Sequence, residues 1–106
     1  MMTPMFASIR KYIGAPLLSD ELVKHQDELK IALRPIKGLH AYYVIKTTDG
    51  AVSFTLCEDK AGVDESNRLE SSWLKDKLPT FSNRVPEIAI GEVRFQLNAQ
   101  LETVPS

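Results

Sequence analysis

The segment from Gly38 to Glu58, GLHAYYVIKTTDGAVSFTLCE, constrains the fold most, because it has the pattern of a β-hairpin. Residues that favour strands, namely Tyr, Val, Ile, Phe and Thr, flank the pair Asp49-Gly50. This pair tolerates the positive φ angles of a two-residue type I′ turn. Such a turn would place Ile45 opposite Phe54, so we predict two antiparallel strands in that register.

Side chains alternate along these strands and therefore divide between two faces of the predicted sheet. The apolar face is expected to be the core face, and it carries Ala41, Tyr43, Ile45, Val52, Phe54 and Leu56. The other face is half polar, and it carries His40, Tyr42, Val44, Lys46, Ser53, Thr55 and Cys57. Because this second face still shows Tyr and Val, we expect a second subunit to cover it.

The rest of the chain predicts two more strands and two helices. Residues 5–13 and 87–97 alternate as strands do, whereas residues 19–34 and 59–78 have apolar side chains at helical spacing. The order βαββαβ predicts an α+β sandwich of the ferredoxin-like kind, with a four-stranded antiparallel sheet and two helices on one face. The face without helices is left uncovered within one chain, so we expect a homodimer built sheet to sheet.

Local signals mark the ends of the two predicted helices. Ser19 and Asp59 are expected to be their N-caps, and Pro35 ends the first helix. On the second helix, Asp64 and Arg68 are expected to form an ion pair across one turn.

The composition limits the class of protein. The chain has 106 residues, of which 43% are hydrophobic, so we expect residues 1–106 to form a single domain, with residues 98–106 as a loosely held tail. The formal net charge is −1 and the basic residues are scattered, which disfavours nucleic acid and anionic membranes as partners. Neither a signal peptide nor a membrane-spanning segment is apparent, so a cytoplasmic location is predicted.

The residues that could bind a metal or form disulfides are few. The one cysteine, Cys57, is expected to be a packed strand residue in a reducing compartment. Acidic residues cluster at Glu58, Asp59, Asp64 and Glu65, but no His or Cys follows at ligand spacing. We therefore expect no metal and no other cofactor.

With this element order the chain resembles the dimeric α+β barrel superfamily. That superfamily includes antibiotic-biosynthesis-monooxygenase-like (ABM-like) proteins, haem-degrading monooxygenases and many small bacterial proteins without an assigned role. The resemblance covers residues 5–97 and rests on the element order and on segments such as MFASIRKY, GLHAYYVI and ESNRLESSWL. It implies a homodimer with a pocket between sheet and helices, where some relatives oxidise quinol-like aromatics without a cofactor. Haem-degrading relatives use a His on the second helix and an Asn on the first strand, whereas this chain has only His25 and His40.

The resemblance also implies site residues of Asn, Trp and Tyr type. Asn67 and Trp73 lie on the predicted second helix, and Tyr43 is expected to face them from the sheet. Tyr43 and Trp73 would hold an aromatic ring, Asn67 would donate a hydrogen bond to a developing oxyanion, and His25 would accept a proton. Each residue also has an ordinary structural explanation, as a packed side chain or as a polar group satisfied by a neighbouring element.

Two functions are compatible with these residues. The first is a cofactor-independent monooxygenase that acts on a phenolic or quinol-type molecule. The second is a non-catalytic dimer that binds a small molecule or another protein. The second predicts that Asn67 and His25 are fully satisfied by protein groups and that there is no cavity between the helices and the sheet.

Overall fold

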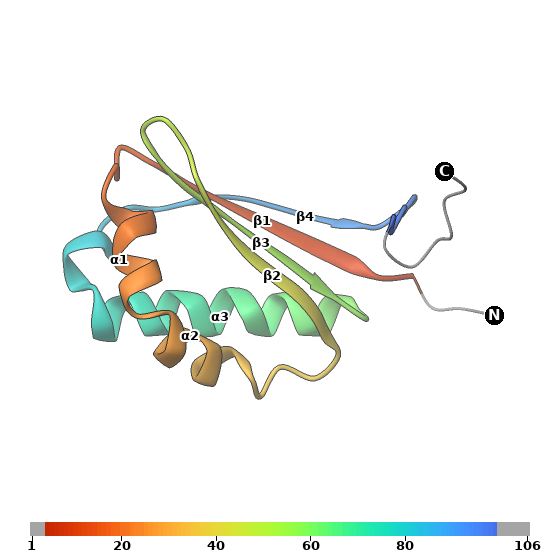
Figure 1. Cartoon of the computed structure of the whole chain (residues 1–106). Helices are drawn as coiled ribbons and strands as arrows, with labels where there is room; N and C mark the ends of the chain where they lie inside the picture. Colours follow the sequence, from red (N-terminus) through yellow and green to blue (C-terminus); the bar gives the residue numbers. More distant parts are fainter. Residues whose placement is uncertain (1–3, 100–106) are drawn as a thin grey trace.

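The structure, a computed structural model, describes residues 4–99, which form a four-stranded antiparallel sheet with three α-helices on one face (Figure 1). The strands, in the spatial order β2-β3-β1-β4, are β1 (Phe6–Ile13), β2 (Leu39–Lys46), β3 (Gly50–Cys57) and β4 (Glu87–Glu92). The helices are α1 (Leu18–Lys24), α2 (Gln26–Leu33) and α3 (Lys60–Lys77), and a 3₁₀ turn, η1 (Pro79–Phe81), follows α3. The predicted ferredoxin-like fold is confirmed.

The single helix predicted over residues 19–34 is in fact two helices. The backbone of His25 leaves the helical region, with φ −107° and ψ 19°, and separates α1 from α2. The N-cap of α1 is Leu17, without a side-chain hydrogen bond, so the capping prediction for Ser19 is wrong. The chain turns earlier than predicted because the Leu18 N–H already bonds to the carbonyl oxygen of Ala15. The apolar sides of both helices still face the sheet, through the buried residues Leu18, Leu22, Leu29 and Leu33.

The long helix α3 begins and ends where the sequence predicts. The carboxylate of Asp59 accepts a hydrogen bond from the N–H of Gly62 at 2.9 Å, which confirms it as the N-cap. The predicted ion pair is wrong, because Arg68 pairs with Glu65 rather than with Asp64. Asp64 is held instead by a lysine one turn earlier.

The β2-β3 hairpin forms, but its register differs from the prediction by two residues. Ile45 lies opposite Val52 rather than Phe54. Gly50 does not have a positive φ, so the turn is not of type I′. A Cβ at Gly50 would lie 1.8 Å from the carbonyl oxygen of Tyr12. The close approach of β1 therefore explains this glycine.

The two faces of the sheet are the reverse of the prediction. A shift of two residues keeps the same side chains together, but the helices cover the half-polar face. Ser53 and Thr55 of β3 are each 2% exposed beneath the helices, whereas Tyr43 and Ile45 on the apolar face are 58% and 48% exposed. The buried side chains of β1 are likewise polar or amphipathic, namely Ser8, Arg10 and Tyr12.

Two strands depart from the predicted alternation. A β-bulge between Leu39 and Ala41 changes the phase of β2. As a result His40 lies with the side chains of the open face, while Tyr42, predicted to lie with it at a dimer interface, faces the helices. β4 ends at Glu92 rather than at residue 97, and its side chains are exposed on both faces because α3 packs on β1 and β3.

Residues 1–3 and 100–106 lie outside the part that the structure describes, so the predicted tail at 98–106 is mostly outside it too. The prediction of a single domain over the whole chain stays a prediction. Among the described residues, no helix has the length and apolar character needed to cross a membrane.

Candidate functional site

A buried hydrogen-bond network between the sheet and α3 is centred on the carboxylate of Glu70. Glu70 is only 2% exposed to solvent. Its Oε2 lies 2.7 Å from Nε of Arg10 and accepts hydrogen bonds from the hydroxyls of Tyr12 (2.5 Å) and Ser53 (3.0 Å). Its Oε1 accepts from the hydroxyl of Tyr42 at 2.7 Å. One helix residue is thus bonded to β1, β2 and β3.

This network accounts for the polar character of the buried face. A buried polar group without a partner costs about 1–3 kcal/mol, and the groups around Glu70 avoid this cost by bonding to one another. Burial, followed by the charge of Glu70, raises the pKa of Tyr12 and of Tyr42 well above the usual value, so both hydroxyls stay protonated and donate. The ion pair of Arg10 and Glu70 adds little net stability, because desolvation of the two charges offsets their attraction.

Asn67, the central residue of the predicted site, belongs to the same network. Its side-chain nitrogen donates to the hydroxyl of Ser8 at 3.0 Å, and its Oδ1 accepts from the guanidinium of Arg10 at 3.2 Å. Both ends of the amide therefore have partners within the protein. The predicted roles of Asn67 in binding or catalysis stay predictions.

The other three predicted site residues lie elsewhere. His25 and Trp73 pack against each other, with ring centroids 6.0 Å apart and planes almost perpendicular. The indole N–H of Trp73 is buried without a hydrogen-bond partner among the described residues. Tyr43 lies on the open face beside Phe54, so the prediction that it faces Asn67 is wrong. The reversed faces of the sheet explain this error.

Glu70, Arg10 and Tyr42 do not stand out in the sequence as site residues, although a signal exists for Glu70. It follows Val63 by seven residues, about 700° around the helix, which places it about 20° from Val63 on the buried stripe. A carboxylate at the centre of a buried stripe requires donors on the element opposite. The side chains of β1 that alternate with Ile9 supply such a donor, Arg10.

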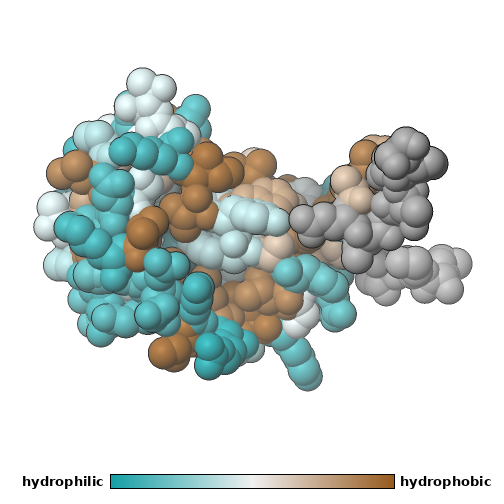
Figure 2. Space-filling view, in the orientation of Figure 1, coloured by the Kyte–Doolittle hydropathy of each residue, from teal (hydrophilic) through white to brown (hydrophobic). Residues whose placement is uncertain are grey.

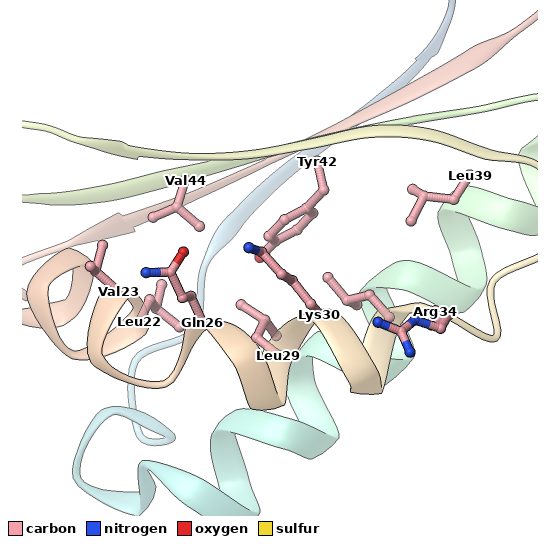
Figure 3. Close-up of a pocket in the computed structure, with 10 residues that line it drawn as sticks. Leu22, Val23, Gln26, Leu29, Lys30, Arg34, Leu39, Tyr42 and Val44 are labelled. Atoms are coloured by element: carbon pink, nitrogen blue, oxygen red, sulfur yellow. The ribbon is translucent and has the colours of Figure 1, made fainter.

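A pocket of about 560 Å³ opens between β2 and the first two helices (Figure 3). Its walls are mostly aliphatic and come from Leu22, Val23, Leu29, Leu33, Leu39 and Val44. Figure 2 shows hydrophobic side chains gathered in the middle of this side of the molecule. The volume falls within the range of about 300–1,000 Å³ that is typical of sites for small molecules.

Tyr42 connects the pocket to the buried network, because its ring lines the pocket while its hydroxyl bonds to Glu70. The polar side chains in the lining are those of Gln26, Lys30 and Arg34, besides Tyr42 itself. None of the residues predicted from the sequence, Asn67, His25, Tyr43 and Trp73, lines this pocket.

Metal-ligating side chains are not gathered at any point of residues 4–99, since no three of the His, Cys, Asp and Glu residues there are placed to hold an ion. The acidic side chains near the end of β3 have other partners: Asp59 caps α3 and Glu65 pairs with Arg68. Cys57 is fully buried against Gly62, and burial raises the pKa of its thiol.

Comparison with solved structures finds proteins of the same fold at low sequence identity. A monooxygenase from the gene ActVA-Orf6 of Streptomyces coelicolor, solved in complex with Nanaomycin D, has a TM-score of 0.63 and 17% identity over 98% of this chain and 94% of its own. A dimeric ferredoxin-like protein from an uncultured marine organism has a TM-score of 0.60 and 17% identity, covering 91% of this chain and 92% of its own. This chain has their ferredoxin-like fold. The resemblance to ABM-like proteins is therefore confirmed at the level of the fold.

A third structure shows that this fold does not select one activity. The heme-degrading protein Rv3592 of Mycobacterium tuberculosis has a TM-score of 0.55 and 15% identity, covering 92% of this chain and 99% of its own. No protein-family model matches the chain, and no curated protein matches it. Proteins with this fold thus carry out different chemistry, so the function of this chain has to be argued from the residues of its site.

Proposed function

We propose that this protein is a homodimer that binds a small, mostly apolar molecule in the pocket between β2 and helices α1 and α2, and that it oxidises a phenolic or quinol-type compound there without a cofactor. The pocket is the observation that carries the proposal, because it has about 560 Å³ and aliphatic walls with a tyrosine. The likeness in fold to a monooxygenase solved with a ligand supports the class of reaction.

The reaction balances without an external reductant when the substrate is a phenol with a free para position. One oxygen atom of O₂ becomes the new carbonyl oxygen of a quinone. The other leaves as water with two hydrogen atoms from the substrate, which loses four electrons. The protein then has to hold the ring, exclude bulk water and favour the phenolate form. Lys30 and Arg34 in the pocket lining provide positive charge for the last of these tasks.

In this proposal Tyr42 and Val44 contact the ring, in the place that the sequence assigned to Tyr43 and Trp73. Asn67 reaches the pocket only through a chain of contacts from Arg10 to Glu70 and on to Tyr42. The proposed roles of Asn67 as an oxyanion donor and of His25 as a proton acceptor are tested directly by Asn67→Ala and His25→Ala.

A non-catalytic binding dimer is the second candidate, and one observation favours it. The amide of Asn67 is hydrogen-bonded by Ser8 and Arg10, as expected of a structural residue. Such a protein would use the same pocket to bind a molecule without turning it over.

Thermal unfolding at fixed protein concentration, with a panel of polycyclic phenols and quinols, tests both candidates. A ligand at about 100 times its dissociation constant adds about 2.7 kcal/mol to the free energy of unfolding, which raises the Tm by several degrees. Val44→Trp fills the pocket and should abolish the rise, whereas Ile31→Trp, on the exposed side of α2, should keep it.

Oxygen uptake with the stabilising ligands then separates the two candidates. Uptake with equimolar quinone formation, reduced in Asn67→Ala or His25→Ala, supports the oxygenase and the roles of these residues. Binding without uptake supports the non-catalytic dimer. Absence of any ligand-dependent rise in Tm would overturn the binding function of the pocket.

A further inference from the structure

The charged side chains that line the pocket are all positive. Lys30 and Arg34 lie one turn apart at the end of α2, and no Asp or Glu is in the lining. Within residues 4–99 neither cation forms a salt bridge. The neighbouring Glu28 has its Oε2 3.6 Å from Nζ of Lys77 on α3, so it pairs with Lys77 rather than with Lys30 or Arg34.

The position of these two cations in the pocket lining says more about a ligand than their position at the end of the helix does. The dipole of α2 favours positive charge in its last turn, but it does not require the side chains to line a pocket. Figure 3 shows Lys30 extending from α2 towards Tyr42, with Arg34 at one end of the pocket and Val23 at the other. The pocket thus has a cationic end and, at Val23 and Gln26, an uncharged end.

The other polar side chains of the wall, those of Gln26 and Tyr42, carry no charge and leave this positive charge unopposed. The hydroxyl of Tyr42 donates to Glu70 at 2.7 Å, so Tyr42 offers a ligand its ring rather than its proton. The charge of Glu70 lies behind that ring and is paired with Arg10. An anionic group in the pocket would therefore meet two cations and no carboxylate of the lining.

We infer that the ligand is an aromatic molecule with one anionic group, whose rings lie against Tyr42, Val44 and Leu29 and whose anion lies beside Lys30 and Arg34. This inference rests on the proposed function, because it names the ligand class of the same pocket. The planar guanidinium of Arg34 can bind a carboxylate or sulfonate through two parallel hydrogen bonds. For a phenolic substrate the anion is the phenolate.

Two fluorescent probes that differ by one group test the inference on the full chain. 8-Anilinonaphthalene-1-sulfonate is anionic, and N-phenyl-1-naphthylamine has the same rings without the sulfonate. We expect the sulfonate probe to bind about tenfold more tightly at low salt, with a smaller preference at high salt because salt screens exposed charges. The double variant Lys30→Gln/Arg34→Gln should lose this preference and bind the neutral probe as the wild type does.

Control variants separate failure of the inference from failure of the proposed function. Lys37→Gln/Lys75→Gln changes the net charge equally at exposed residues outside the lining, and it should keep the preference. Val44→Trp should weaken both probes, and unchanged binding in this variant would place them outside the pocket and overturn the proposed function. Equal binding of both probes in the pocket, unaffected by Lys30→Gln/Arg34→Gln, would overturn the anion inference alone. Thermal unfolding of each variant shows that it is folded.

Discussion

At the scale of residues, Glu70 is the buried charge that joins α3 to the sheet. Its two carboxylate oxygens bind Arg10, Tyr12, Ser53 and Tyr42, which come from three strands. The cost of desolvating Glu70 and Arg10 offsets their attraction, so the pair adds little net stability. Its main contribution is to orient α3 on the sheet. In the observed placement of α3 this buried charge has donors on three strands.

Removal of the Glu70 carboxylate should therefore destabilise the protein strongly. In Glu70→Ala the guanidinium of Arg10 stays buried without its anion, which costs about 3–5 kcal/mol of the free energy of unfolding. Urea unfolding at fixed protein concentration measures this cost. The control is Glu65→Ala on the same helix, whose exposed pair with Arg68 should contribute about 1 kcal/mol or less. Equal costs for the two variants would contradict a central role for Glu70.

The sequence predicted local contacts only in part, because the cap at Asp59 is confirmed whereas the Ser19 cap and the Asp64–Arg68 pair are wrong, and it missed contacts between distant residues. The cap at Asp59 was predictable because its partner, Gly62, lies three residues away. The hydrogen bond between Tyr12 and Glu70 joins residues 58 positions apart, and the pattern of a short segment does not predict such a pair. The core face of the sheet was misassigned for the same reason, since polar groups are buried there only because α3 satisfies them.

At the scale of elements, order and type were predictable, whereas register was not. Alternation and helical spacing are properties of short segments, and they correctly predicted β1, β2, β3 and α3. The register of β2 against β3 also depends on β1, because the carbonyl oxygen of Tyr12 approaches Gly50. The local sequence at Asp49-Gly50 predicts a type I′ turn, but it gives no information about the contact with β1.

Two strand glycines provide a matched test of this explanation. In Gly50→Ala the new Cβ would meet the carbonyl oxygen of Tyr12 at 1.8 Å, so β1 and β3 must separate, and we expect a loss of more than about 2 kcal/mol in the free energy of unfolding. In Gly91→Ala nothing lies within 4 Å of the new Cβ, so the change should be neutral or stabilise by less than about 1 kcal/mol. Similar unfolding curves for both variants would show that Gly50 is not needed for close approach.

At the scale of the whole molecule, the main unexplained feature of a single chain is its open apolar sheet face. Ile9, Ile13, Tyr43 and Ile45 are each 43–58% exposed there. One part of this face, which includes Tyr43 and Phe54, forms a groove of about 880 Å³ with residues 93 and 95–99. Monomeric proteins rarely expose contiguous apolar surface of this kind, and a second copy of the chain would cover it. The homodimer predicted from the sequence thus stays a proposal, with the apolar face rather than the half-polar face as its interface.

A charge on this face should dissociate the proposed dimer. Ile45→Lys would bury an unpaired ammonium against the apolar surface of the partner, and the cost of several kcal/mol should give monomers at micromolar concentration. Sedimentation equilibrium across a range of concentrations measures the change. The control is Ile31→Lys, which introduces the same charge at an isoleucine of α2 that is 62% exposed, and it should remain dimeric. Dissociation in both variants would point to a general effect of charge, and a dimer in both would place the interface elsewhere.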